Sequence, residues 1–549
     1  MKTNLIFILS FALLFASCTS TTDNIPEKVI QGIEIEEITR IVKTFSADSF
    51  LGRKPFTIGE EKAIDFLINE YQRIGLEPAV DGSYLQEVPM VEVTVKPQEQ
   101  MVFYSDEKQL KLNNQDDFVA FSRRLQDHIS IKNSELVFAG HGIVAPEYNW
   151  NDYEGLDVEG KTVIVLVNDP GFRTEDEDLF NGRSMTYYGR WTYKYEEAAR
   201  QGAAALLIVH ETEPAGYPWS VVLNGAIIPK LYLRAEDNYH SRCAVEGWLT
   251  KASAQQLFAL NGLNLEEQIE AASNPGFKAK DLSASMSFEM ESSHRFASSY
   301  NVIGKIPGTD RADEAIVYSS HWDHLGVGRA MNGDSIYNGA VDNGTTTAWM
   351  LEIAEAFTEM PEGPRRTILI LSPTAEEQGL IGSSYYTQNP VIPLDKTVAN
   401  INNDLMIPYG PYKDVMVTGY GQSELEDYVK KHAETQGRYI LPDPNPHTGM
   451  YYRADHFPFA KAGVPALFVR GNCDNVEHGK EWALEKEKNW LENYYHKPTD
   501  EYENWWNLEG VVQDARLLFR VGYDLSMRDD FPEWKEGSEF KSKRDEMMK

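Results

Sequence analysis

The chain has 549 residues, of which 42% are hydrophobic and 11% aromatic. This length suffices for more than one folded domain, and this apolar content argues against extensive disorder. The formal net charge of -32 would repel nucleic acid and anionic lipid headgroups, so we expect no nucleic-acid partner.

The first residues have the pattern of an export signal. Lys2 precedes an apolar run from Leu5 to Phe15, which is too short for a comfortable membrane span. The stretch that ends in Cys18 resembles a bacterial lipobox, although Phe15 stands where leucine is usual. We therefore expect an exported protein of the periplasm or outer membrane, attached to the membrane only through a lipid on Cys18. An ordinary cleaved signal is the alternative.

Cysteine usage limits the kind of metal site that the chain can build. Besides Cys18 it has only Cys243 and Cys473, and it has no C-x-x-C motif. This excludes a zinc site made of thiolates. Any metal must be held by histidine and carboxylate side chains, and whether Cys243 and Cys473 pair stays open.

In the first half of the chain, helical spacing of apolar residues predicts two helices between residues 34 and 84, followed by short strands up to residue 132. Two strands at 135–140 and 161–167, a helix at 193–203 and a buried strand at 204–210 form a βα-type unit. Between residues 274 and 299 the sequence is polar, and we expect an irregular return segment there.

From residue 301 onward, strands alternate with amphipathic helices. Strands are expected at 301–308, 315–321, 367–373 and 397–404, with helices at 345–357 and after residue 379. This alternation predicts an α/β fold, a mostly parallel mixed sheet with helices on both faces.

Histidine and acidic residues stand at the ends of these elements, where functional groups gather in α/β sheets. They are His321 with Asp323, Asp342, Glu376 with Glu377, Asp404 and, after a polar loop, His496. Each alone has an ordinary explanation; an aspartate before a helix, for example, is usually a helix cap. As an ordered set in one half of the chain, they indicate a metal site.

The residue types match the needs of two neighbouring cations. Two such ions need a bridging carboxylate, with about one histidine and one further carboxylate each. That inventory is supplied by His321, Asp342, Glu377, Asp404 and His496. Glu376 is then a spare carboxylate suited to act as general base. Asp323 lies two residues from His321 and is placed to accept its other imidazole N–H.

Six motifs resemble, in order and spacing, those of the co-catalytic zinc peptidase family, which includes bacterial leucyl aminopeptidase, glutamate carboxypeptidase and the one-zinc glutaminyl cyclase. The motifs are HWDHLG, GAVDNGTT, AEEQGLIGS, NNDL, ADHFPFAKAGVPAL and YYHKPTD, within residues 301–507. Residues 48–78 resemble the N-terminal part of the same family. Residues 135–171 resemble the β-rich protease-associated domain that many members carry as an insertion.

The resemblance implies a role for each site residue. Asp342 would bridge two zinc ions and be followed by a cis peptide bond. One ion would add His321 and Asp404, and the other Glu377 and His496. Glu376 would be the general base for a water between the ions, and Tyr495 would steady the oxyanion. Arg453, Asp455 and His456 would line the substrate cleft without binding metal, although Ala454 departs from the commoner serine.

The residue pattern and the resemblance together predict a division of the chain. In order, we expect a signal peptide (1–17), a polar tether (18–32), the N-terminal part of the catalytic domain (33–125), a protease-associated domain (126–285), the catalytic zinc peptidase domain (286–530) and a charged, solvated tail (531–549).

The expected function is that of an exported aminopeptidase that acts on peptides with two zinc ions. A carboxypeptidase of the same family would need a dense arginine cluster for the terminal carboxylate, and only Arg453 and Arg470 stand near the site. A single-zinc acyltransferase like glutaminyl cyclase and a non-catalytic binding protein remain alternatives. The terminal residue preferred and the oligomeric state stay open.

Overall fold

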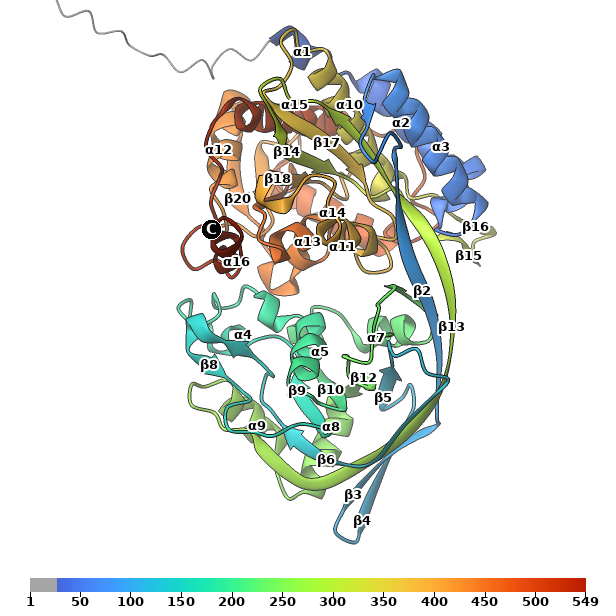
Figure 1. Cartoon of the computed structure of the whole chain (residues 1–549), viewed down its shortest axis with the longest axis vertical. Coiled ribbons are helices and arrows are strands. Elements are labelled where there is room, and N and C mark those ends of the chain that lie inside the picture. Colours follow the sequence, from blue (N-terminus) through green and yellow to red (C-terminus); the bar gives the residue numbers. More distant parts are fainter. Residues whose placement is uncertain (1–26) are drawn as a thin grey trace, which may run out of the picture.

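A computed structural model describes residues 27–549. The predicted signal peptide, Cys18 and most of the predicted tether lie outside these residues. Figure 1 shows two bodies joined along one side by two long strands, β2 (Leu85–Pro97) and β13 (Lys280–Ile306). Within residues 27–549, none of the helices combines the length and apolar character that crossing a membrane requires.

The first body, which holds the predicted metal residues, is built on a mixed sheet. Its central strands β17, β14, β18 and β21 run parallel, and β13 and β19 are antiparallel to the outer members of this group. The strands are β14 (Arg311–Ser319), β17 (Arg366–Ser372), β18 (Thr397–Asn402), β19 (Asp414–Val417), β20 (Tyr439–Pro442) and β21 (Ala466–Arg470). The predicted α/β class with a mixed sheet is confirmed.

Helices cover both faces of this sheet, which explains why its strands are apolar throughout. In β14, Ile316 and Tyr318 pack on one face, whereas Ala315 and Val317 pack on the other. The first face is covered by α2 (Ile35–Phe45), α3 (Ile58–Arg73), α10 (Thr346–Thr358), α12 (Leu425–Thr435) and α15 (Glu509–Met527). The second is covered by α11 (Ile381–Gln388) and α13 (His456–Lys461).

The second body has its own core, and its strands continue the same 17-stranded sheet through β2 and β13. Parallel strands β6 (His128–Phe138), β9 (Thr162–Leu166), β10 (Ala205–His210) and β12 (Val245–Thr250) are flanked by the antiparallel β5 (Phe118–Phe121). A hairpin of β3 (Gln100–Ser105) and β4 (Lys108–Asn113) pairs with β13. Helices α5 (Trp191–Arg200), α8 (Lys251–Leu260) and α9 (Leu265–Ala272) complete it. The boundary predicted at residue 126 therefore falls inside this body, between β5 and β6.

The segment expected to be irregular, residues 274–299, mostly belongs to the 27-residue strand β13. Its polar side chains are compatible with a strand because β2 and β6 pair with its backbone along most of its length. The polar residues of this segment are the solvent-facing side chains of a strand, so their polarity did not indicate an irregular segment.

Both ends of the described chain are packed, contrary to the predicted tether and solvated tail. Helix α1 (Glu27–Gln31) buries Val29 and Ile30. Near the other end, Trp534 and Phe540 are buried against the first body, and α16 (Lys541–Met547) follows them. Because charged residues surround these apolar side chains in the sequence, their burial was not predicted.

The C-terminal segment also ties the two bodies together. Glu539 accepts hydrogen bonds from the backbone N–H of Tyr187, at 3.1 and 3.0 Å, and from the Tyr452 hydroxyl at 2.8 Å. Lys461 of the first body pairs with Glu196 of the second at 2.6 Å. These contacts hold Tyr452 and Lys461 of the first body against the second.

Candidate metal centre

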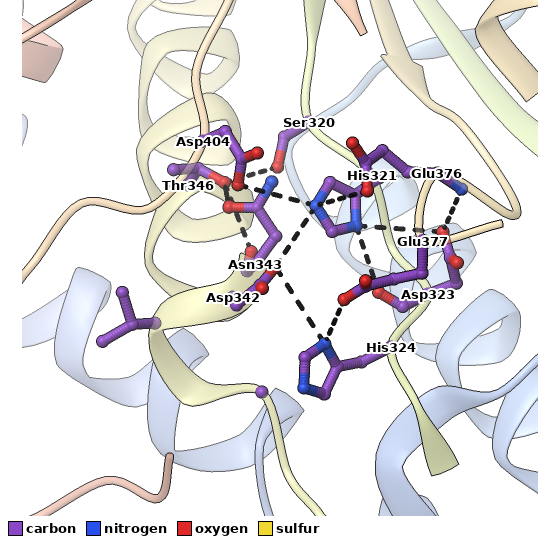
Figure 2. Close-up of polar contacts among 12 residues, drawn as sticks. Ser320, His321, Asp323, His324, Asp342, Asn343, Thr346, Glu376, Glu377 and Asp404 are labelled. Atoms are coloured by element: carbon purple, nitrogen blue, oxygen red, sulfur yellow. Dashed lines mark hydrogen bonds and ion pairs between the residues drawn. The ribbon is translucent and has the colours of Figure 1, made fainter. Parts of the chain in front are cut away.

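The predicted site residues meet at one edge of the first body's sheet (Figure 2). His321 follows β14, Glu376 and Glu377 follow β17, and Asp404 follows β18. Because these strands are parallel, their carboxyl ends lie at the same edge. Asp342 comes from the helical turn η5 (Ala340–Thr345) that leads into α10. Its peptide bond to Asn343 is cis, as the resemblance implied.

Asp342 lies between two histidines. Its Oδ1 is 3.4 Å from His321 Nε2, and its Oδ2 is 3.3 Å from His496 Nε2. His321 Nε2 is also 3.6 Å from Asp404 Oδ1, and His496 Nε2 is 3.0 Å from Glu377 Oε2. Two ligands of one tetrahedral zinc ion, each about 2.05 Å from the metal, are about 3.3 Å apart. These spacings suit two cation positions that share Asp342.

Unpartnered buried atoms test whether cations fit here. Within residues 27–549, His321 Nε2 and Asp404 Oδ1 are buried and have no hydrogen-bond partner. They belong to the group His321, Asp342 and Asp404, whose nitrogen and oxygen atoms lie within 4.8 Å of one another; His324, Asp342 and Glu377 form a second group of this kind. Since buried polar atoms are normally satisfied, the donor set fits metal ions.

The charges of the site lead to the same interpretation. Burial alone favours neutral Asp342, but the contacts with His321 and His496 outweigh it and hold its pKa well below the usual range. Burial also opposes ionisation of Glu377, yet the neighbouring His496 helps to lower its pKa to about 2. Burial disfavours protonated His321, but Glu376 and the aspartates raise its pKa well above the usual value. The site therefore attracts positive charge, which a divalent cation supplies more fully than a proton.

Glu376 stands beside the two groups without belonging to either. Its Oε2 is 3.8 Å from His321 Nε2, and its backbone N–H donates to Asp323 Oδ1 at 3.0 Å. Burial, together with the charge of Asp404, raises the pKa of Glu376 well above its usual range, although His321 acts in the opposite direction. A carboxylate in this position can exchange protons with a bound water or substrate.

Asp323 differs in detail from the prediction. His321 Nδ1 makes its 3.1 Å hydrogen bond to the backbone oxygen of Asp323, and the nearer carboxylate oxygen is 3.8 Å away. The carboxylate is engaged by the Glu376 N–H instead. Asp323 thus fixes both the imidazole and the backbone of Glu376, through different atoms.

The residues predicted to line the cleft occupy different environments. The Tyr495 ring stacks on His496, with 3.8 Å between ring centroids. Asp455 is buried and accepts the Ser383 hydroxyl at 2.5 Å. Arg453 donates to the Thr448 backbone oxygen, and its guanidinium lies over Tyr217 of the second body.

His456 does not line a cleft. It is fully buried, and its ring contacts those of Tyr451 and Phe468 at centroid distances of 4.6 and 5.2 Å. As the first residue of α13, it faces the core beneath the loop and not the substrate side.

Three residues near the metal groups were not predicted: His324, Arg53 and Asp500. His324 is the second histidine of HWDH, and its Nδ1 lies 2.6 Å from Glu377 Oε1. The carboxylate of Asp500 accepts the backbone N–H groups of Val341 and Asp342 at 3.0 and 3.1 Å. The repeated histidine was a usable signal for His324, and the HKPTD motif contains Asp500, but their partners are distant in sequence.

Arg53 is fully buried behind the site. Its guanidinium donates to the backbone oxygens of Trp322, Asn338 and Gly339 at 2.9, 2.5 and 2.9 Å. It thereby joins the segment that follows β14 to the segment that carries Asp342. No local pattern around residue 53 indicates these partners, because they lie 269 or more residues away.

Residues 301–518 match the family model described as Peptidase family M28. The match covers about two fifths of the chain and places this segment among sequences similar to that family. The matched range contains all five predicted metal ligands and Glu376.

Curated relatives match parts of the chain. The mouse (Mus musculus) protein named Aminopeptidase NAALADL1 is 38% identical over 114 residues, 20% of this chain and 14% of the relative. Aminopeptidase YwaD of Bacillus subtilis (strain 168) is 28% identical over 239 residues, 43% of this chain and 46% of the relative. The chain thus spans less than half the length of these relatives. A solved aminopeptidase from Aneurinibacillus sp. strain AM-1 aligns with 92% of this chain and 97% of its own, at 15% identity and a TM-score of 0.49.

Proposed function

We propose that the chain is a zinc-dependent aminopeptidase that removes N-terminal residues from peptides with the help of two zinc ions. The observation that carries the proposal is Asp342, whose two carboxylate oxygens face the separate histidines His321 and His496. One ion would be held by His321, Asp404 and Asp342, and the other by Glu377, His496 and Asp342. Zinc in such a site lowers the pKa of bound water and polarises a carbonyl.

The chain's own residues have separate tasks. Glu376 accepts a proton from the attacking water on its side-chain carboxylate and later delivers it to the leaving amine. The hydrogen bond from the Glu376 N–H to Asp323 keeps this residue beside the site. Tyr495, whose ring stacks on His496, would donate a hydrogen bond from its hydroxyl to the oxyanion.

Aminopeptidase is the specificity that the findings favour within the family. The segment that matches the M28 family model contains the five predicted metal ligands and Glu376, and both curated relatives described above carry the name aminopeptidase. The buried carboxylates also suit a substrate's positively charged α-amino group. Asp455 Oδ2, which has no hydrogen-bond partner among the described residues, is one candidate to receive it.

Glu376→Gln tests the mechanism. The amide keeps the size of the side chain but cannot accept the proton, so we expect both zinc ions to remain while turnover falls about 100- to 10,000-fold. Glu434→Gln, at an exposed position of α12, is the matched control and should leave activity unchanged. Near-normal activity of Glu376→Gln would remove Glu376 from the mechanism.

A substrate panel tests the specificity. Peptides and aminoacyl anilides with a free amino terminus should be hydrolysed, and the same compounds with an acetylated amino terminus should not. Release of C-terminal residues from blocked peptides would show a carboxypeptidase. Cyclisation of N-terminal glutamine with one zinc per chain would show the acyltransferase alternative.

We also propose that the chain is exported and attached through a lipid on Cys18. The support is the signal-like sequence that ends in Cys18. Labelled fatty acid should be incorporated into the full chain and not into Cys18→Ala, which should be released from the membrane fraction. Equal labelling of both would contradict the anchor.

A further inference from the structure

His324 lies against the second cation position but is absent from the five predicted ligands. Its side chain is fully buried, and Figure 2 shows its ring close to Glu377. Its Nδ1 is 2.6 Å from Glu377 Oε1 and 4.0 Å from Asp342 Oδ1. Among residues 27–549, neither ring nitrogen has a hydrogen-bond partner with the proper geometry. A buried imidazole of this kind calls for a partner.

The distances separate His324 from the histidines that suit a metal. His496 Nε2 lies 3.0 and 3.3 Å from its two carboxylate neighbours, close to the edge of about 3.3 Å expected for two ligands of one tetrahedral zinc. For His324 the same two contacts are 2.6 and 4.0 Å. The first is too short for two ligands of one ion and the second is too long. A short N···O contact of this kind is typical of a hydrogen bond to a carboxylate.

The two oxygens of Glu377 therefore face different histidines. Oε1 lies at His324, and Oε2 lies at His496. A carboxylate held through one oxygen has its other oxygen fixed in direction, and such outer contacts orient metal ligands in proteins. His324 is in the position to hold Oε1 and leave Oε2 directed at the cation.

Gly339 leaves the space that the His324 ring occupies. Gly339 has φ +61°, and a Cβ there would come within 2.7 Å of the His324 ring and 2.1 Å of the Asp342 backbone oxygen. Any other residue at 339 would push against the ring, since this backbone region also disfavours side chains. The loop that carries Asp342 is thus packed directly on His324.

We propose that His324 is a positioning residue for the second zinc ion, donating a hydrogen bond from Nδ1–H to Glu377 Oε1. This inference rests on the proposed two-zinc function, because it concerns the second ion. The two atoms already lie within hydrogen-bond distance of each other. His324 is not assigned as a metal ligand.

His324→Asn and His324→Gln test the proposal, because both introduce an amide donor but differ by one methylene in side-chain length. Asparagine can place its Nδ2–H₂ near the position of the imidazole Nδ1–H, whereas glutamine carries its amide one methylene farther. We expect His324→Asn to bind the second zinc within about threefold of the wild-type affinity. His324→Gln and His324→Ala should lose about 10- to 100-fold in that affinity, the usual effect of removing such an outer contact. Binding of the ion at His321, Asp342 and Asp404 should be unaffected.

The measurement is zinc titration of the metal-free full chain by calorimetry against a competing chelator, with zinc per chain counted after dialysis. His210→Ala, which removes a buried histidine from the second body, should match the wild type. His496→Ala should lose the second ion outright. Melting curves of the metal-free variants verify that each one folds. If His324→Ala does not fold, the comparison of His324→Asn with His324→Gln still tests the proposal.

Three results would overturn the proposal. Unchanged second-ion affinity in both His324→Gln and His324→Ala would show that the contact has no role. An equal loss in His324→Asn and His324→Gln would show that the imidazole is a ligand and not a donor. A wild-type chain that binds one zinc would contradict the two-zinc function itself, and His324 would then have no second ion to position.

Discussion

Replacing Arg53 with methionine should destabilise the first body more than any surface change, because Arg53 joins three segments from behind the metal centre. Besides the carbonyls of Trp322, Asn338 and Gly339, its guanidinium donates to the Phe45 oxygen at 3.0 Å. Burial lowers the pKa of Arg53 to about 10, so it remains charged at neutral pH. Methionine fills much of the same space but donates no hydrogen bond.

The magnitude follows from the atoms left without a partner. Five buried carbonyl oxygens would lose a donor, at about 1 kcal/mol for each of the four shorter contacts and less for the Asp342 oxygen at 3.4 Å. The positive charge that faces Asp342, Asp323 and Asp500 would also be lost, whereas the cost of burying the guanidinium would be relieved. Since removing one partner from a buried charged network costs about 3–5 kcal/mol, we expect a loss of about 4 kcal/mol.

Differential scanning calorimetry of the metal-free chain is the suitable assay, because it separates this effect from zinc binding and can resolve the two bodies. A domain of this size shifts by about 2–4 °C per kcal/mol, so the melting of the first body should fall by about 10 °C. Arg53→Lys, which can satisfy fewer carbonyls, should fall between. Arg528→Met, which removes a partly exposed pair with Asp530, should change the melting temperature little. A shift of less than about 3 °C for Arg53→Met would refute the reasoning.

Three further predictions concern the site and the contact between the bodies. Asp500→Ala leaves the N–H groups of Val341 and Asp342 without acceptors, so it should cost about 2–4 kcal/mol and lower the zinc content, with Asp500→Asn intermediate; full zinc content in thermally unchanged Asp500→Ala would contradict this. Burial raises the pKa of Glu539 from 4.5 to about 8, so its penalty on the folded state is absent below pH 4.5 and grows as pH rises toward 8. Glu539→Gln should therefore match the wild type at pH 4.5 and exceed it by about 1–2 kcal/mol at pH 8, a value reduced for the partial exposure of the side chain; parallel pH profiles of the two in denaturant unfolding would disprove this role. Removing zinc with a chelator should abolish hydrolysis and lower the melting temperature of the first body alone. The lost stabilisation is about 4 kcal/mol when zinc was present at 1,000 times its Kd, and added zinc should restore both activity and stability. A change in the melting of the second body instead would place the metal elsewhere.

Much of the first body was predictable from local patterns. The apolar runs of β14, β17 and β18 are buried on both faces, so their sequences identify them as central strands. Residues a few positions after such a run lie near the edge of the sheet, as His321, Glu377 and Asp404 do. The strand pattern alone therefore predicts that these three side chains share one edge of the sheet.

The site's supporting contacts could not be predicted in this way. Arg53 and Trp322 are 269 residues apart, and nothing near residue 53 indicates which carbonyls it reaches. The Asp323 carboxylate was expected at His321 but is taken by the Glu376 backbone. Such choices depend on distances between loops that only the folded chain sets.

The burial of charged, polar segments was also not predictable from the sequence. The C-terminal residues read as a solvated tail, yet Trp534 and Phe540 are buried and Glu539 ties the two bodies together. The sequence by itself determined the kinds of side chains at each strand end and hence the chemistry available, because strand periodicity and burial are local. The tertiary structure alone decided which oxygen of Glu377 faces His324 and which faces His496, because that depends on how separate loops pack against one another.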